Sequence, residues 1–358
     1  MRREHAILVL TMFLVFIAIS YVALKYSGNS KNPGTDLLTG KSALVPAKEM
    51  QKEKPKIVTD DGSLDVTFCP RENCSSYAEH QLRSAQTSVH CAFYDFRLDN
   101  LISALGDAST RGVDVKVVVD DANTQYIENA SFAFKTDPAN TMMHNKFCII
   151  DGRTVLTGSF NPTSNCAFKN NNNFIVVNSP VLAKQYSAEF DEMWSGRFSS
   201  GMKSERELVV LPNISLEVYF CPDDGCEAKL NSLLANANSS IYFMTFSFTL
   251  DSSKDILIQK YRSGLTVEGV FEKQQLSDWD IYDGLLLEGL PVMLDTNKYK
   301  LHHKVFIIDN STIVTGSMNP TNNGVKHNDE NMLIIYDKEG SIARRFIEEF
   351  AYVYPDKI

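Results

Sequence analysis

An eight-residue stretch that occurs twice decides how this sequence folds. Residues 144–151 read HNKFCIID and residues 302–309 read HHKVFIID, at an offset of 158. Both copies continue in step, because TGSFNPT at 157–163 matches TGSMNPT at 315–321. Self-similarity at a fixed offset indicates a duplicated structural unit.

Upstream landmarks extend the repeat over most of the chain. LDVTFCP at 64–70 reappears as LEVYFCP at 216–222, at an offset of 152. The larger offset of 158 at the later motifs places a six-residue insertion in the second copy. We therefore predict two tandem units, over 62–200 and 208–357.

Short apolar runs alternate with amphipathic stretches in each copy. Runs rich in β-branched and aromatic residues predict strands, and apolar residues at helical spacing predict helices. The predicted strands are 66–68, 88–94, 113–119, 146–150, 155–158, 174–177, 240–247, 265–271, 304–308, 313–316 and 332–335, and the helices are 76–85, 98–111, 181–194 and 341–353. The pattern predicts an α/β fold in which each unit is a mixed β-sheet flanked by helices.

The N-terminal segment has a different composition from the repeat. Residues 6–24 contain no charged residue and would span roughly 28 Å as a helix, about the thickness of a bilayer core. We predict a cytoplasmic tip and transmembrane anchor over 1–27, followed by a flexible tether over 28–61; a cleaved signal peptide is the alternative. Arg2 and Arg3 favour a single-pass orientation with the catalytic body on the extracytoplasmic side.

Charge and composition narrow the possible partners. With 44% hydrophobic and 22% charged residues, the 358-residue chain is typical of a globular protein. Its net charge of -9 divides into +4 for 1–60, -5 for 61–200 and -8 for 201–358. An acidic body excludes a nonspecific DNA-coating protein, which needs a broad positive surface. A phosphodiester substrate would be bound only where lysines are concentrated locally.

Each copy contains H-x-K-x4-D followed by G-S-x-N, with fourteen residues from His to Gly. Side chains two apart in a strand point the same way, so the histidine and lysine of each motif lie together. An imidazole can attack phosphorus or transfer a proton, and an ammonium group binds phosphate. The candidate catalytic residues are His144, Lys146, Asn161, His302, Lys304 and Asn319, with hydroxyls from Ser159 and Ser317 in support and with Asp151 and Asp309 expected to hold the fold.

These motifs resemble the phospholipase D superfamily, whose signature is H-x-K-x4-D with G-S-x-N downstream, usually twice per active unit. The resemblance covers nearly all of 62–357, and the GSFNPT and GSMNPT tails are similar to its compact nuclease-like branch. It implies a pseudo-twofold pair of units with one site at their seam. One histidine would form a phosphohistidine and the other would protonate the leaving alcohol, with the lysines and asparagines stabilising charge. The scheme needs no metal, cofactor or second chain.

One carboxylate distinguishes the two copies. Glu330 matches the superfamily carboxylate that hydrogen-bonds a catalytic imidazole, whereas Asn172 occupies this position in the first copy. We therefore expect His144 to lack a carboxylate partner. Which histidine is the nucleophile does not follow from the sequence.

The seven cysteines include two pairs with the same spacing. The C-P-x3-C spacing of Cys69 with Cys74 and of Cys221 with Cys226 predicts two small disulfide rings if the body is exported. A zinc site shared by these four cysteines is the alternative. Cys91 and Cys148 lie in apolar strands and are expected to be buried thiols.

Three functions are compatible with these observations. The first is a metal-independent endonuclease acting on single-stranded nucleic acid, and the second is a phospholipase, favoured by the anchor, the basic tether and the acidic body. The third is an inactive membrane scaffold. Lipid-cleaving members of the superfamily generally carry larger insertions around the site, so two compact units favour the nuclease. We predict a membrane-anchored phosphodiesterase whose substrate is nucleic acid or phospholipid.

Overall fold

The computed structural model describes residues 55–138 and 140–355. The predicted anchor and the predicted tether up to residue 54 lie outside these residues. Among the described residues, no helix combines the length and the apolar composition that a bilayer crossing requires. Both copies of the repeat belong to one unit, Lys54–Ile358.

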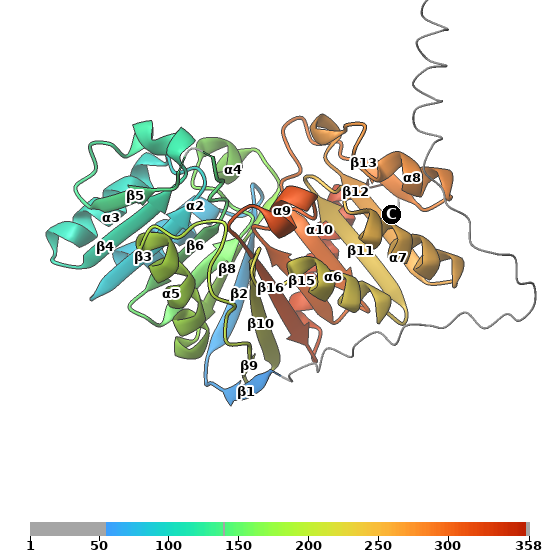
Figure 1. Ribbon diagram of the computed structural model, residues 1–358, viewed down its shortest axis with the longest axis horizontal. Helices are drawn as coiled ribbons and strands as arrows, with labels where there is room; N and C mark the ends of the chain where they lie inside the picture. The colour runs from blue at the N-terminus through green and yellow to red at the C-terminus, as the bar shows by residue number, and fades with distance from the viewer. Residues whose placement is uncertain (1–54, 139, 356–358) are drawn as a thin grey trace, which may run out of the picture. The chain divides into compact units, whose positions relative to one another are not determined.

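The first copy folds into a seven-stranded mixed sheet (Figure 1). Strands β3, β4 and β5 are parallel to one another, and the remaining neighbours are antiparallel. The strand order is β2 (Ser63–Cys69), β8 (Asn172–Asn178), β7 (Thr154–Gly158), β6 (Lys146–Ile150), β3 (Ser88–Phe93), β4 (Asp114–Val119) and β5 (Ala133–Thr136). Its helices are α2 (Cys74–Arg83), α3 (Asp99–Thr110), α4 (Ser164–Phe168) and α5 (Pro180–Trp194), with a 3-10 turn η1 (Asp121–Tyr126). The mixed α/β fold predicted for this unit is confirmed.

The second copy repeats this topology and adds two strands at one edge. Its sheet order is β1 (Lys56–Thr59), β9 (Glu207–Val210), β10 (Ile214–Cys221), β16 (Glu330–Asp337), β15 (Thr312–Gly316), β14 (Lys304–Ile308), β11 (Ser240–Thr245), β12 (Thr266–Phe271) and β13 (Val292–Leu294). Its helices are α6 (Cys226–Ala235), α7 (Asp251–Arg262), α8 (Tyr282–Leu287), α9 (Asn322–Lys326) and α10 (Ser341–Val353), with a 3-10 turn η2 (Lys273–Gln275).

The end of the predicted tether is part of this second sheet. Residues 56–59 were expected to be flexible, but they form β1, which pairs in parallel with β9. The pairing gives their backbone groups partners, and Lys56 Nζ lies 2.8 Å from Glu207 Oε1. The tether prediction is therefore wrong for these four residues, because the chain before the first repeat completes the sheet of the second.

Strand registers locate the six-residue insertion. In the first sheet Val119 is opposite Thr136, and in the second Phe271 is opposite Leu294. The offset between equivalent residues is thus 152 before this connection and 158 after it. The extra residues lie between β12 and β13, in the connection that contains η2 and α8.

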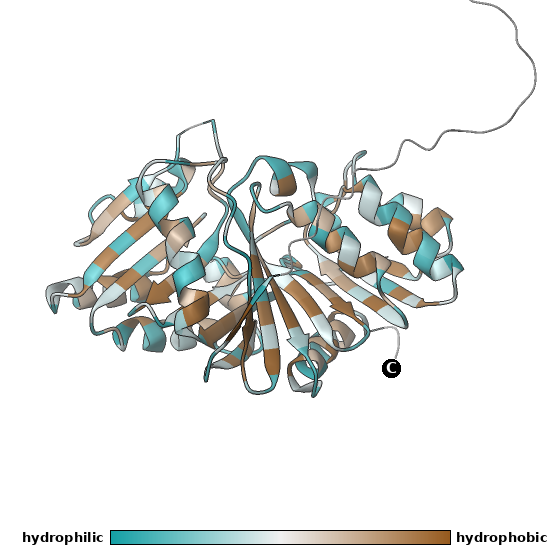
Figure 2. Ribbon diagram, turned by 60° about the horizontal axis from the view of Figure 1, so that its bottom comes forward, coloured by the Kyte–Doolittle hydropathy of each residue, from teal (hydrophilic) through white to brown (hydrophobic). Residues whose placement is uncertain are grey.

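The two sheets pack through helices α5 and α10. Each of these helices contacts strands of both sheets, and a central hydrophobic cluster combines residues from both halves, including Tyr186 and Phe346. Apolar bands on the strands are visible in Figure 2. Ser179 caps α5 by accepting a hydrogen bond from the Leu182 amide, and Pro180 suits the first helical turn. Two outer clusters lie beneath α2 and α3 in the first half and beneath α6 and α7 in the second.

Three disulfides lie within the halves. Cys69–Cys74 and Cys221–Cys226 close equivalent rings, so these cysteines hold no thiolates for the alternative zinc site. Cys91 and Cys148 also form a disulfide, and the expectation that they are thiols is wrong. The antiparallel register of β3 and β6 places them directly opposite each other, with their Cα atoms 4.0 Å apart.

Candidate active site

Each H-x-K motif lies at the start of a buried strand, where the two halves meet. Strand β6 begins at Lys146 and β14 begins at Lys304, so each motif histidine lies two residues before the start of its strand. The His144 amide donates to the Asp329 carbonyl at 3.0 Å, and the His302 amide donates to the Asn171 carbonyl at 2.8 Å. Each histidine is therefore held in place by backbone of the other half.

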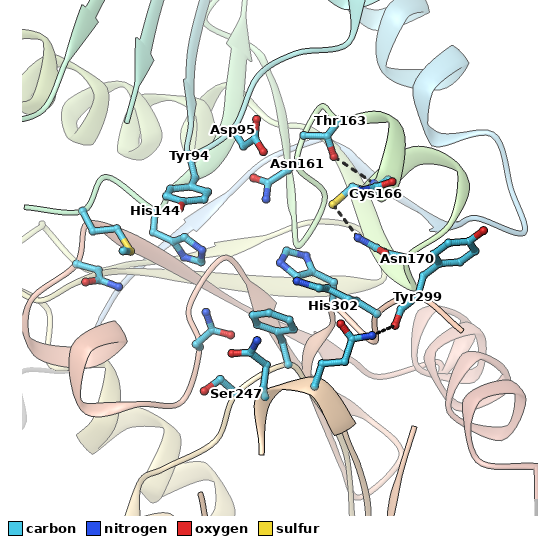
Figure 3. A pocket seen from close by; sticks show the side chains of 18 of the residues that line it. Tyr94, Asp95, His144, Asn161, Thr163, Cys166, Asn170, Ser247, Tyr299 and His302 are labelled. Atoms are coloured by element: carbon cyan, nitrogen blue, oxygen red, sulfur yellow. Dashed lines mark hydrogen bonds between the residues drawn. The ribbon is translucent and has the colours of Figure 1, made fainter. Parts of the chain in front are cut away.

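The two imidazoles share one pocket. The pocket has a volume of about 780 Å³ and is lined by His144, His302, Asn161 and Asn319 together with residues from both halves. Figure 3 shows the two rings close together, with Asn161 directed toward the same space. The geometry therefore brings both copies of the motif to a single site.

Each histidine forms a hydrogen bond with a side chain of the opposite half. His144 Nδ1 lies 2.7 Å from Glu330 Oε1, and His302 Nδ1 lies 2.8 Å from Asn172 Oδ1. The expectation that His144 lacks a carboxylate is thus wrong. Glu330 and Asn172 begin the last strand of their sheets, β16 and β8, and from there each side chain reaches the histidine of the opposite half.

These contacts set the tautomers of both rings. A carboxylate and an amide oxygen only accept hydrogen bonds, so Nδ1 donates in each case and Nε2 keeps its lone pair. His302 Nδ1 also lies 3.1 Å from the Ser159 carbonyl oxygen, a second acceptor. Each ring consequently has one unprotonated nitrogen free for nucleophilic attack or proton transfer.

Burial makes both histidines weakly basic. It lowers the pKa of His144 to about 4, against the opposing influence of the Glu330 carboxylate. Burial also lowers the pKa of His302 well below its usual value, and the charges of Lys304 and Lys146 add to this effect. Both rings are therefore neutral at neutral pH, and among the described residues a carboxylate favours the cationic form of His144 alone.

The two lysines are buried beneath the histidines, with exposures of 1% and 2%. Lys146 Nζ donates to the His144 carbonyl at 2.6 Å, and Lys304 Nζ donates to the His302 carbonyl at 2.9 Å. Burial lowers the pKa of Lys146 to about 8, and it lowers the pKa of Lys304 with a contribution from the neighbouring Lys146 charge. A bound phosphate would favour the charged form of both lysines.

Two aromatic rings that the sequence reasoning missed complete the site. Tyr94 packs edge-on against His144, with ring centroids 5.1 Å apart, and Phe246 packs in the same way against His302 at 4.8 Å. The ammonium groups of Lys146 and Lys304 lie 5.6 and 4.7 Å from the Tyr94 and Phe246 centroids respectively. Tyr94 and Phe246 are related by the repeat offset of 152, a signal that could have identified them.

Asn161 and Asn319 project amides into the pocket. Both residues line the pocket. The side-chain oxygen Oδ1 of each is buried and has no hydrogen-bond partner among the described residues. A buried polar atom without a partner is costly. Because an amide oxygen only accepts hydrogen bonds, a bound molecule with an N–H or O–H donor would supply the missing partner.

The remaining motif residues lie away from the pocket. Ser159 and Ser317 are fully buried, and their Oγ atoms accept the amides of Asn173 and Asn331 at 3.0 and 2.8 Å. They therefore organise backbone, and the expected contribution of their hydroxyls to the pocket is not made. Asp151 accepts the three amides of residues 86–88, and Asp309 accepts those of 238–240, as residues that hold the fold would.

The structure also brings together a carboxylate group that the sequence did not reveal. Oxygens of Asp120, Asp121 and Asp137 lie within 4.8 Å of one another. Burial raises the pKa of Asp120 to about 6. Asp137 accepts the amides of Asp121 and Met143 at 2.9 and 3.0 Å, so it fastens the loop that leads into His144.

Comparisons with known proteins agree with this geometry. Residues 79–194 and 230–354 match the family model described as "Cardiolipin synthase, PLD-like domain". A mitochondrial cardiolipin hydrolase of Xenopus tropicalis is 32% identical over 148 residues, which cover 37% of this chain and 70% of that protein. A phospholipase D of Rickettsia bellii is 29% identical over 184 residues, which cover 49% of this chain and 89% of that protein.

Two solved structures are similar to this chain to different extents. Phosphatidylserine synthase from Haemophilus influenzae Rd KW20 matches with a TM-score of 0.63 at 14% identity, over 79% of this chain and 84% of that chain. Nuc from Salmonella typhimurium, a phospholipase D family member, is 32% identical over 38% of this chain and 95% of its own, with a TM-score of 0.36. The first of these similarities extends across both halves of the repeat.

Proposed function

Because the chain belongs to the PLD-like domain family and is a phosphodiester hydrolase of the phospholipase D superfamily, we propose that its substrate is single-stranded nucleic acid. In this proposal it is a membrane-anchored, metal-independent endonuclease that acts through a phosphohistidine. The observation that carries the proposal is the chemical character of the pocket lining.

Amides dominate that lining. Eight side-chain amides line the pocket, namely Asn161, Asn165, Asn170, Gln274, Gln275, Asn319, Asn323 and Asn328. Tyr94, Phe246 and Tyr299 add aromatic rings, while Leu, Ile and Val are absent from the described lining. Amides can hydrogen-bond base edges, and aromatic rings can stack on bases. A pocket for acyl chains would be lined instead by aliphatic side chains.

The pairing of His144 with Glu330 of the opposite half supports His144 as the nucleophile. In the first step Nε2 of His144 bonds to phosphorus as the bond to the leaving oxygen breaks, and His302 delivers a proton to that oxygen. His302 would acquire this proton as the phosphodiester anion binds, because a nearby negative charge favours the imidazolium. Glu330 would stabilise the positive charge that develops on His144 when it becomes phosphorylated.

A water molecule would complete the reaction. His302 Nε2 takes a proton from the water as its oxygen bonds to phosphorus, and the bond from phosphorus to His144 breaks. The products are a phosphomonoester and an alcohol. His144 returns to its starting tautomer. His302 is left protonated, and as the products leave it releases to solvent the proton that it took up when the substrate bound. Lys146 and Lys304, whose ammonium groups hydrogen-bond the backbone carbonyls of His144 and His302, would offset charge on the phosphoryl oxygens.

We also propose that the catalytic body lies on the extracytoplasmic side of a membrane. Three disulfides support this placement, because disulfides persist mainly in oxidising compartments. Protease digestion of sealed cells should remove the body if it is exported and spare it if it faces the cytoplasm.

Phospholipid hydrolysis is the second candidate. It is favoured by relatives that are named phospholipase D and mitochondrial cardiolipin hydrolase. The uncharged run at residues 6–24 would place such an enzyme beside its substrate.

One substrate screen separates the two candidates. The full-length protein, in EDTA, is offered end-labelled single-stranded DNA and RNA or vesicles of phosphatidylcholine and phosphatidylglycerol. We expect internal cleavage of an oligonucleotide, with loss of activity in His144→Asn. Head-group release from vesicles without oligonucleotide cleavage would transfer the assignment to the phospholipase, and activity that requires added metal would contradict the metal-independent scheme.

A further inference from the structure

The rim of the pocket differs between the two halves. The three residues at 298–300, just before the second motif, are Lys-Tyr-Lys, whereas Asn-Thr-Met occupies the equivalent positions 140–142. Lys298, Tyr299 and Lys300 all line the pocket. The second half therefore contributes two cations and an aromatic ring where the first half contributes neutral side chains.

A fourth residue joins this group from across the seam. Lys169 Nζ lies 5.2 Å from the centroid of the Tyr299 ring, and Lys298 Nζ lies 6.0 Å from it. Lys300 Nζ lies 5.5 Å from the centroid of Phe246, the ring that packs on His302. We call Lys169, Lys298, Tyr299 and Lys300 the basic rim.

The basic rim is available for a ligand. Within the described residues, none of its three lysines forms an ion pair with a carboxylate. Tyr299 is 40% exposed despite its place at the pocket mouth. The lysine charges are thus free to meet an anion, and the Tyr299 side chain is accessible to a ligand.

Hydrogen bonds hold this loop in a fixed shape. The Tyr299 amide donates to Asn297 Oδ1 at 2.9 Å, and its carbonyl accepts Gln274 Nε2 at 2.9 Å. Asn297 Nδ2 in turn donates to the Lys169 carbonyl at 3.1 Å, so the loop is fastened to the other half. A preorganised loop loses less conformational entropy when it binds a ligand.

Among the described residues that line the pocket, the opposite rim offers no positive charge without a carboxylate partner. Arg97 forms an ion pair with Asp95, and its guanidinium lies 4.7 Å from the centroid of the Tyr126 ring. Met142, which is equivalent to Lys300, is 40% exposed. Free positive charge is therefore concentrated on the His302 side of the pocket.

We propose that the basic rim is a binding subsite for the strand on the leaving-group side of the scissile bond. The inference rests on the proposed nuclease function. Its lysines would bind the phosphate next to the one that is cleaved, and a base would stack on Tyr299. Because the subsite exists on one side only, the strand lies across the two histidines in a single direction, with its leaving segment on the side of His302.

Binding measurements test the subsite directly. The affinity of the full-length protein for a labelled twelve-residue oligothymidylate is measured by anisotropy at several salt concentrations, in the His144→Asn background to prevent turnover. Lys298→Gln with Lys300→Gln should weaken binding at least tenfold and reduce the slope of log K against log salt by about 0.7 for each lost phosphate contact. Tyr299→Ala should weaken binding about tenfold with little change in that slope.

A charge-matched control separates local contacts from net charge. Lys184→Gln with Lys338→Gln removes two exposed lysines that do not line this pocket. We expect this variant to bind within twofold of its parent. Equal loss of affinity in both double variants would overturn the subsite, because it would show only a general charge effect.

Cleavage assays distinguish failure of this inference from failure of the proposed function. In proteins that retain His144, the ratio of kcat/KM for the oligonucleotide to kcat/KM for bis(p-nitrophenyl) phosphate should fall at least tenfold in the rim variants. Wild-type protein that cleaves the reporter but no oligonucleotide would refute the nuclease. Wild-type protein that cleaves oligonucleotides while the ratio is unchanged in the rim variants would refute the subsite alone. If the rim variants instead lost activity only on anionic vesicles, the assignment of this subsite to a nucleic-acid strand would be overturned.

Discussion

The two halves of this molecule build the same scaffold but unequal sides of one site. Each contributes a histidine, a lysine and an asparagine, yet His144 is paired with Glu330 and His302 with Asn172. Both halves thus supply the groups that a two-histidine reaction needs in duplicate. They differ in the groups that would give the two histidines different tasks.

A second difference lies in the cores behind the motifs. The first half joins β3 to β6 with the disulfide Cys91–Cys148, and the second places Phe243 opposite Phe306 at the equivalent register. The two phenylalanine rings lie 6.0 Å apart and pack with Phe248 and Phe271. The same strand pair is therefore held covalently in one half and by aromatic packing in the other.

Replacing each histidine in turn should have the largest effect on activity and should show most clearly how the two halves differ. With bis(p-nitrophenyl) phosphate, His144→Asn should lose at least 10³-fold in rate and form no phosphoenzyme, because it lacks the nucleophile. His302→Asn should still release one equivalent of nitrophenol, since this leaving group needs little protonation, and should then stall because no base activates water. Rapid-quench kinetics and mass spectrometry of the trapped protein measure both results.

The reverse pattern would reassign the nucleophile. A stable adduct on His302 in the His144→Asn variant would show that the Asn172-paired ring attacks phosphorus. Absence of an adduct in both variants and in the wild type would contradict the covalent mechanism.

Removing the disulfide that only the first half contains should have the next largest effect. Cys91 and Cys148 are 57 residues apart, so the chain-entropy model predicts that Cys91→Ala with Cys148→Ala lowers the free energy of unfolding by about 4 kcal/mol. Cys221→Ala with Cys226→Ala opens a ring of only five residues' separation and should cost about 2 kcal/mol. Urea denaturation of the oxidised proteins compares the two. Equal losses of unfolding free energy in the two variants would show that loop length does not determine how much each disulfide stabilises the protein.

The repeat could predict the scaffold and most of the site, but not the contacts between halves. Spacing alone identified the strands that follow His144 and His302, and the offset of 152 could also have identified Tyr94 and Phe246. It could not assign Glu330 to His144, because a side chain at a strand start reaches a residue of the other half. The pairing of Cys91 required the register of two strands that are distant in sequence.

Changing the charge of Glu330 or Asn172, the hydrogen-bond partners of the two imidazoles, should have the smallest effect on activity. These changes should nevertheless alter the pH profile most clearly. His144 must be neutral to attack phosphorus, so kcat/KM falls as the pH drops through its pKa, which burial lowers to about 4. Glu330 opposes that shift, so Glu330→Gln should move the acid limb to a still lower pH while lowering the plateau about 10²-fold. The profile of kcat/KM against pH for the reporter substrate gives both quantities.

The matched change in the other half should act on the other ring. Asn172→Asp places a carboxylate beside His302 and should raise the pKa of that imidazole, so His302 stays protonated to a higher pH. In the profile of kcat/KM for an oligonucleotide, whose leaving oxygen needs the proton, the limb that belongs to the general acid should then move upward, while Glu330→Gln moves the limb of the nucleophile downward. If Glu330→Gln instead shifts the acid limb upward, or if both variants move the same limb, then the two histidines do not have the separate roles that their unequal partners indicate.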